Sequence, residues 1–338
     1  MRPKEMSIFD FHASVLQDYQ QYVQSFLSIS DEAILEFVER KLLEESVLWP
    51  DALIQLNPAY QQAETVDQLA ASGLLLPTTA EILRTQNGDP IRLYRHQQDA
   101  VELAARRRSY VVTSGTGSGK SLTYFIPIFD SILRGNFEEC KVCAIVVYPM
   151  NALVNSQWES LNALAESYQR RAGREMPVRF AKYTGQESDT QKREIQEGRP
   201  HVLLTNFVML EMMLLRPQES AFVDRATAAL QFLVLDELHM YRGRQGADVA
   251  MLVRRLKQRC GNPNLLHIGT SATMISSPSA APQERRQAVA DFASRLFGAP
   301  VPPENIIEES LVPIAFQSSP PTPEELRAAL NAPLPAGI

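Results

Sequence analysis

The stretch Ser109-Tyr-Val-Val-Thr-Ser-Gly-Thr-Gly-Ser-Gly-Lys-Ser121 decides how the chain folds. Its first part, Tyr110–Thr113, is aromatic and β-branched and predicts a strand. The glycine-rich run 114–121 follows at once, and an apolar helix is expected over about 120–134. A strand, a glycine-rich loop and a helix are the context that a phosphate-binding loop of pattern G-x-x-x-x-G-K-[ST] requires. The first position of this pattern is Ser114 instead of glycine, which is a departure.

The residues of this loop are of the types that bind a polyphosphate. Glycines let the backbone wrap closely around the anion, and backbone N–H groups at a helix N-terminus point toward it. Lys120 is expected to reach the β- and γ-phosphates, and the Ser121 hydroxyl is expected to ligate Mg²⁺. The sequence therefore predicts ATP and Mg²⁺ as cofactors, with nucleotide contacts from Thr116, Gly117, Ser118, Gly119, Lys120 and Ser121.

Outward from this loop, short apolar runs alternate with helical stretches over residues 91–298. The alternation predicts an α/β fold with a mostly parallel sheet that is covered by helices on both faces. Residues 1–90 are expected to form an accessory helical segment, and the proline-rich residues 299–338 are expected to form a linker. The expected strands are 110–113, 142–148, 178–182, 201–205, 232–235 and 265–269.

Two neighbouring acids follow another of these expected strands, Phe232–Leu235. Ligands of open α/β sheets bind outside the carboxyl ends of the strands, so we expect these acids to lie near the phosphate-binding loop. Such a site needs an acid that holds Mg²⁺ and a base that orients the attacking water. Asp236 suits the first role and Glu237 the second. The predicted catalytic residues are Lys120, Asp236 and Glu237, and the predicted metal ligands are Ser121 and Asp236.

The composition of the chain excludes several classes of protein. The 338 residues are 45% hydrophobic and 21% charged, as in ordinary globular proteins. A net charge of −6 argues against a protein coated in positive charge, but it leaves room for a local basic groove. No apolar run reaches the ~18 residues of a membrane span, and the start lacks the apolar segment of a signal peptide. With only three cysteines, we expect a cytoplasmic protein without a membrane partner.

Residues 91–298 resemble the first RecA-like domain of superfamily 2 helicases, the DEAD/DEAH-box group in its broad sense. The resemblance implies a RecA-like P-loop NTPase domain, in which Leu238 stands where the box usually has alanine. The signatures occur in the order of the family. They are Leu93-Tyr-Arg-His-Gln97 (Q motif), 114–121 (motif I), Tyr148–Gln157 (motif Ia), Thr184-Gly185, Thr205-Asn206, Asp236-Glu-Leu-His239 (motif II) and Ser271-Ala-Thr273 (motif III).

The resemblance also implies roles for individual residues. Gln97 would read the adenine edge, and Tyr94 or Arg95 would pack on the adenine ring. His239, Ser271 and Thr273 would couple the state of the nucleotide to the nucleic acid. The residues implied to hold the phosphates of one strand, without reading its bases, are Pro149, Asn151, Thr184, Gly185, Thr205 and Asn206.

A second RecA-like domain supplies the arginines that complete the ATP cleft in this family. No Gln-x-x-Gly-Arg-x-Gly-Arg-like run follows Thr273 in the sequence. We therefore expect the chain to be the N-terminal part of a helicase, either a fragment or one half of a split enzyme. On this interpretation, the missing domain comes from a longer chain or from a partner.

Two longer stretches, Leu203–Glu211 and Asp236–Ala247, are similar to large bacterial DNA helicases. These include MrfA-type repair helicases and the helicase subunits of anti-phage systems such as DISARM and Druantia. The expected function is ATP-dependent movement on nucleic acid, DNA in preference to RNA. Two alternatives stay open. One is an RNA helicase, because the same motifs serve both. The other is a nucleotide-binding interaction module without turnover, which the missing arginines favour and the intact Glu237 opposes.

Overall fold

The chain divides into two compact units in the computed structural model, residues 1–57 and 58–338. The first unit holds helices α1 (Ile8–Gln24) and α2 (Glu32–Glu39), which begin at the side-chain caps Ser7 and Asp31. Two predicted site residues, Thr116 and Thr273, lie outside the described residues. The structure describes residues 7–26, 29–41, 58–115, 117–135, 142–198, 200–217, 219, 222–223, 229–272, 281–312, 322–324 and 327–328.

The second unit carries a seven-stranded sheet in which every strand pairing is parallel. The strand order is β5-β6-β4-β7-β8-β3-β9. The strands are β3 (Tyr110–Thr113), β4 (Ala144–Tyr148), β5 (Phe180–Lys182), β6 (Val202–Asn206), β7 (Phe232–Leu235), β8 (Leu266–Ser271) and β9 (Ile306–Glu308).

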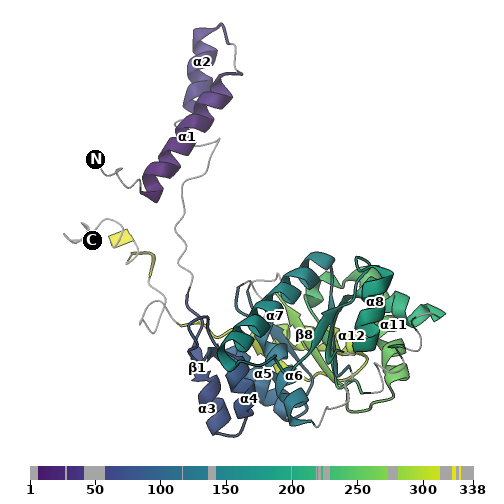
Figure 1. Cartoon of the computed structure of the whole chain (residues 1–338). Helices are drawn as coiled ribbons and strands as arrows, with labels where there is room; N and C mark the ends of the chain where they lie inside the picture. The colour runs from purple at the N-terminus through teal and green to yellow at the C-terminus, as the bar shows by residue number, and fades with distance from the viewer. Residues whose placement is uncertain are drawn as a thin grey trace. The chain divides into compact units, whose positions relative to one another are not determined.

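Helices cover both faces of this sheet, which confirms the predicted α/β fold (Figure 1). Successive side chains of a strand point to opposite faces, so Val111 joins one buried cluster while Tyr110 and Val112 join the other. The cluster that contains Val111 packs against α9 (Phe207–Leu215), α11 (Gly243–Cys260) and α12 (Pro282–Phe297). The opposite cluster packs against α5 (Arg95–Ala105), α6 (Leu122–Arg134) and α7 (Asn151–Ala172).

Three further short elements lie at the carboxyl end of β5 and beyond β7 and α12. Helix α8 (Asp189–Gly198) follows the loop after β5. The 3-10 helix η2 (Leu238–Met240) contains part of motif II, and η3 (Pro303–Asn305) leads into β9. These elements connect strands and helices but add no strand to the sheet.

The second compact unit reaches beyond residues 91–298 at both ends. On the amino side, β1 (Gln62–Thr65) pairs antiparallel with β2 (Arg92–Tyr94), and α3 (Val66–Ala71) and α4 (Pro77–Ile82) pack with them. These elements share a small buried cluster with α5 and α6 through Val101 and Ile126. On the carboxyl side, β9 pairs with β3 inside the expected linker.

In the part of the chain that the structure describes, no helix combines the length and the apolar character needed to cross a bilayer.

Candidate functional site

Three neighbouring strands deliver the predicted nucleotide-binding residues to one edge of the sheet. Strand β3 runs into the glycine-rich loop, β7 into Asp236, and β8 ends at Ser271. Because β7, β8 and β3 are adjacent and parallel, their carboxyl ends lie side by side. The structure therefore brings together residues that are more than 100 positions apart in the sequence.

The glycine-rich loop folds back on its own lysine. The Lys120 ammonium donates to the backbone oxygens of Ser114 and Gly115 at 3.0 and 3.2 Å. Gly117 and Gly119 have φ angles of +79° and +70°, a conformation that side chains disfavour. The loop needs these two glycines to turn, and it leads into the N-terminus of α6, which begins after Ser121.

Ser114, the departure from the pattern, is part of the architecture of the loop. Its hydroxyl lies 2.6 Å from the Ser118 hydroxyl, and both residues are buried. Its backbone N–H donates to the Ser271 oxygen at 3.1 Å. A serine fits here because its polar atoms all have partners within the loop and on β8.

The two acids of motif II have different environments. Asp236 is buried and accepts a hydrogen bond from the Thr270 hydroxyl. Burial raises the pKa of the Asp236 carboxyl to about 6, and the hydrogen bond from Thr270 opposes that rise. Glu237 adopts a left-handed conformation with φ +53°, and its carboxylate lies 3.9 Å from the Lys120 ammonium. The strained turn at Glu237 aims its side chain at the loop.

The donor set at this site fits Mg²⁺ bound together with a polyphosphate. A buried carboxylate with a raised pKa gains from a neighbouring cation, and Mg²⁺ prefers oxygen ligands. Asp236 and the Ser121 hydroxyl offer such oxygens. Among the described residues, no group of three or more His, Cys, Asp or Glu side chains could hold a metal ion. Phosphate oxygens and water would therefore supply the remaining ligands.

His239 links motif II to the end of β8. Its Nδ1 lies 3.3 Å from the Ser271 hydroxyl and 3.2 Å from a Glu237 carboxylate oxygen. The same Ser271 accepts from Ser114 through its backbone oxygen. These contacts form a chain from the glycine-rich loop through β8 to the predicted base.

Motif II also packs closely on β8. Leu238 is fully buried, and a Cβ built on Gly269 would lie 2.5 Å from its Cδ1. The glycine at this position therefore makes room for the leucine that replaces the usual alanine of the box.

Gln97 reaches the glycine-rich loop directly. Its side-chain amide donates to the Gly119 oxygen at 3.0 Å and to the Ser118 oxygen at 3.3 Å. Its carbonyl oxygen accepts from the Tyr94 N–H at 2.9 Å. In this arrangement both ends of the amide contact the protein, and its contact with adenine stays a prediction.

Sequence reasoning missed two residues at this loop. The Glu309 carboxylate accepts from the Gly115 N–H at 2.8 Å, and the Tyr60 ring lies 5.2 Å from that of Tyr94. Tyr60 lies at the start of the second unit and Glu309 directly after β9, next to the place where backbone bonds join residues 59–61 to 310–312. The apolar pair Ile306-Ile307 before Glu309 was the available signal, but it is too short to show a period.

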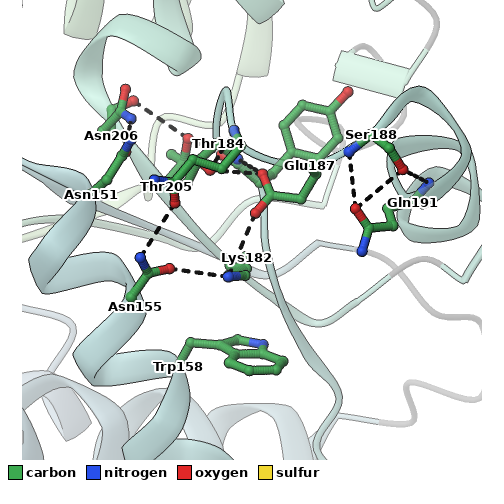
Figure 2. Close-up of polar contacts among 12 residues, drawn as sticks. Asn151, Asn155, Trp158, Lys182, Thr184, Glu187, Ser188, Gln191, Thr205 and Asn206 are labelled. Atoms are coloured by element: carbon green, nitrogen blue, oxygen red, sulfur yellow. Dashed lines mark hydrogen bonds and ion pairs between the residues drawn. The ribbon is translucent and has the colours of Figure 1, made fainter.

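Four of the predicted nucleic-acid residues lie close together where β4, β5 and β6 end: Asn151, Thr184, Thr205 and Asn206 (Figure 2). Asn206 donates to Asn151 at 2.5 Å, and its oxygen caps α9 through the Met209 N–H. Pro149 lies between β4 and α7. We call the following residues the polar cluster: Asn151, Asn155, Lys182, Thr184, Glu187, Thr205 and Asn206.

Two threonines of the polar cluster are fully buried. The Thr205 hydroxyl donates to the Tyr183 oxygen at 2.7 Å, and the Thr184 hydroxyl donates to Glu187 at 2.7 Å. Gly185, by contrast, is exposed, and a Cβ built on it would meet no atom within 4 Å. The backbone at Gly185 is open to the approach of a nucleic-acid strand, whereas the two threonine hydroxyls are used in hydrogen bonds within the protein.

Residues 94–281 match the family model described as DEAD/DEAH box helicase. The Druantia protein DruE of Escherichia coli (strain UMEA 4076-1) is 25% identical in an alignment 377 residues long, which covers 80% of this chain and 20% of DruE. The uncharacterized ATP-dependent helicase YprA of Bacillus subtilis (strain 168) is 30% identical over 186 residues, 54% of this chain and 23% of YprA. The chain thus spans about a fifth to a quarter of these relatives.

Solved structures with the same fold include the DUF1998 helicase MrfA bound to DNA. It matches with a TM-score of 0.59 at 24% identity, over 79% of this chain and 34% of MrfA. Another crystal structure of MrfA matches at 27% identity with a TM-score of 0.50, over 64% of this chain and 30% of MrfA. The DEAD-box helicase Mss116 bound to ssRNA and UDP-BeF matches with a TM-score of 0.55 at 15% identity, over 75% of this chain and 47% of Mss116.

Proposed function

The chain belongs to the DEAD/DEAH box helicase family, and from that premise we propose that it is the ATP-binding half of a helicase or translocase that moves on DNA. The observation that carries this proposal is the chain of contacts from Lys120 through Glu237 and His239 to Ser271. It joins the groups that bind phosphate, activate water and sense the nucleotide. A P-loop that only binds nucleotide would not need a base held by a histidine and a serine.

In the proposed mechanism, Lys120 leaves the oxygens of Ser114 and Gly115 and pairs with the β- and γ-phosphates. Mg²⁺, when bound with the nucleotide, would neutralise phosphate charge between the Ser121 hydroxyl and Asp236. Glu237 accepts a proton from the water that attacks the γ-phosphate. His239 and Ser271 orient Glu237 and carry changes at the γ-phosphate into β8.

A second RecA-like domain is proposed to complete the cleft with its arginines. The curated relatives are four to five times longer than the matched part, which leaves room for such a domain in them. Arginine fingers contribute on the order of 10³–10⁵ in rate in P-loop enzymes. Residues 1–338 alone should therefore turn over ATP below about 1 s⁻¹, the low end of typical enzyme rates. Faster turnover by the purified chain would show that it completes its own site.

DNA is proposed as the substrate in preference to RNA. The sequences of Leu203–Glu211 and Asp236–Ala247 resemble those of DNA helicases. MrfA, which is 27% identical in one crystal structure, is bound to DNA in another. Roles in DNA repair or anti-phage defence are part of the same proposal. So is a cytoplasmic location, where an ATP-driven motor meets its nucleotide.

The proposal is tested by two titrations of residues 1–338. In the first, a fluorescent ATP analogue is added with and without Mg²⁺, and saturable Mg²⁺-dependent binding is expected. In the second, labelled single strands of DNA and RNA of matched sequence are compared by anisotropy. Failure to bind nucleotide, or failure to bind any strand, overturns the proposal, and tighter binding of RNA turns it toward an RNA helicase.

A further inference from the structure

Lys182, the last residue of β5, contacts side chains of helix α7 and of the loop that follows β5. Its ammonium donates to the Asn155 side-chain oxygen at 3.0 Å and lies 3.9 Å from a Glu187 oxygen. It also lies 5.0 Å from the centre of the Trp158 ring. Figure 2 shows Lys182 between Asn155 and Glu187, with Trp158 on its other side. None of the motifs that resemble the family includes this lysine.

The buried carboxylate of Glu187 accounts for a cation at this place, but it makes no hydrogen bond to the Lys182 ammonium. Its side chain is only 5% exposed, and one oxygen accepts from the Thr184 N–H at 2.5 Å and from the Thr184 hydroxyl at 2.7 Å. The other oxygen has no hydrogen-bond partner among the described residues. A buried carboxylate is costly unless it is paired. At 3.9 Å, Lys182 supplies charge to this oxygen without a hydrogen bond.

The position of Lys182 matches that of a ligand contact. Its side chain is 29% exposed, and it stands at the carboxyl end of β5, three residues before Gly185 in the chain. Asn155 joins it to the start of α7, and Glu187 joins it to the loop after β5. A lysine carries a compact charge on a long stem, so it can reach a phosphate while its stem stays in place.

We propose that Lys182 is a further phosphate contact for the bound strand, oriented by Asn155, Glu187 and Trp158. This inference rests on the proposed function and deepens it, because it assigns the charge that the buried threonines of the polar cluster lack. The ammonium would pair with one phosphate of a single strand and would release the counterion of that phosphate. The contact involves no base edge and is independent of sequence.

The competing explanation is that Lys182 only compensates the buried charge of Glu187. A double-mutant cycle separates the two explanations. The full chain is titrated by anisotropy with one labelled single strand of DNA at two salt concentrations. The variants are Lys182→Gln, Lys182→Arg, Glu187→Gln and the double variant with both glutamines. Lys192→Gln is the control, because Lys192 lies over the Tyr183 ring at the wall of a separate cavity.

A phosphate contact predicts that Lys182→Gln weakens binding roughly five- to tenfold and lowers the salt slope by about 0.7, the value for one single-strand contact. The same loss is expected in the Glu187→Gln background. Lys182→Arg keeps the charge and should stay within about twofold of wild type, as should Lys192→Gln. Thermal unfolding of each variant checks that the fold is intact.

The inference is wrong if wild type binds the strand and Lys182→Gln leaves the salt slope unchanged. It is also wrong if the loss disappears when Glu187 is already glutamine, since Lys182 would then only compensate that acid. If wild type binds no strand at all, the proposed function itself fails. The failure of the inference can therefore be told apart from the failure of the function on which it rests.

Discussion

Around the glycine-rich loop, the predicted side chains face one another. Lys120 lies 3.9 Å from Glu237, and His239 lies 3.3 Å from Ser271. At the carboxyl ends of β4, β5 and β6, the predicted threonines are buried and their hydroxyls bond to the protein. In the first region, the motif side chains contact one another next to the loop that we propose binds nucleotide. In the second, part of the motif side chains bond to the protein, and we propose that other groups there contact the strand.

Two glycines express the same contrast in steric terms. Gly269, beneath motif II, has Leu238 packed so tightly against it that a Cβ would lie 2.5 Å from Leu238 Cδ1. Gly185, in the loop after β5, has open space where a Cβ would stand. Gly269 therefore serves internal packing, whereas the space around Gly185 is open. Around the glycine-rich loop the motif residues are packed or bonded to one another, whereas the loop after β5 leaves space beside Gly185.

The largest expected effect is confined to the first region. Lys120→Ala removes a charge-assisted contact to the phosphates, so nucleotide affinity should fall roughly 100-fold, which corresponds to about 2.7 kcal/mol. Binding of single-stranded DNA without nucleotide should stay within about twofold, because Lys120 faces Glu237 and not the polar cluster. A fluorescent-nucleotide titration and a DNA anisotropy titration measure the two. Equal nucleotide affinity of variant and wild type would contradict the assignment of Lys120.

The second prediction concerns the packing of motif II. Gly269→Ala should lower the free energy of unfolding by about 1–3 kcal/mol, the usual cost of overpacking a core. Leu238 is fully buried, and the new methyl group would lie 2.5 Å from its Cδ1 and 3.2 Å from Val111 Cγ2. Introducing Leu238→Ala as well should remove most of this cost, because alanine leaves room for the new methyl group. Urea unfolding of the two single variants and the double variant measures the coupling, and additive losses would show that these residues do not compete for space.

The sequence predicted the first region better than the second for a physical reason. Strands β3 and β7 have the expected bounds, 110–113 and 232–235, because buried parallel strands are continuous apolar runs that turn residues end sharply. The residues of the P-loop and of motif II lie directly after those runs. We could predict that they lie close together because ligands of open α/β sheets bind at the carboxyl ends of the strands.

The rest depended on contacts between segments that are distant in the sequence. Lys182 looks like an ordinary surface charge in the sequence, and only the fold brings it to Asn155. Strand β9 has three residues and lies in a proline-rich stretch that predicts a linker. It joins the sheet because Ile306 and Ile307 enter the two buried clusters on opposite faces. Such pairing with β3 leaves no local pattern that a sequence window could detect.

The smallest expected effect tests the open side of the comparison. Gly185→Ala should leave the free energy of unfolding within about 0.5 kcal/mol of wild type, as for a surface change. The new methyl group meets no protein atom within 4 Å, and Gly185 is not among the residues with positive φ. If a strand backbone passes close to Gly185, the same methyl group obstructs it and weakens binding of every single strand by about tenfold, or 1.4 kcal/mol. Nucleotide affinity should not change.

Anisotropy titrations with several unrelated DNA strands measure the effect. Gly198→Ala is the control, because Gly198 in α8 is exposed and its Cβ position is equally open. Equal DNA affinity of Gly185→Ala and wild type would place the path of the strand away from this loop.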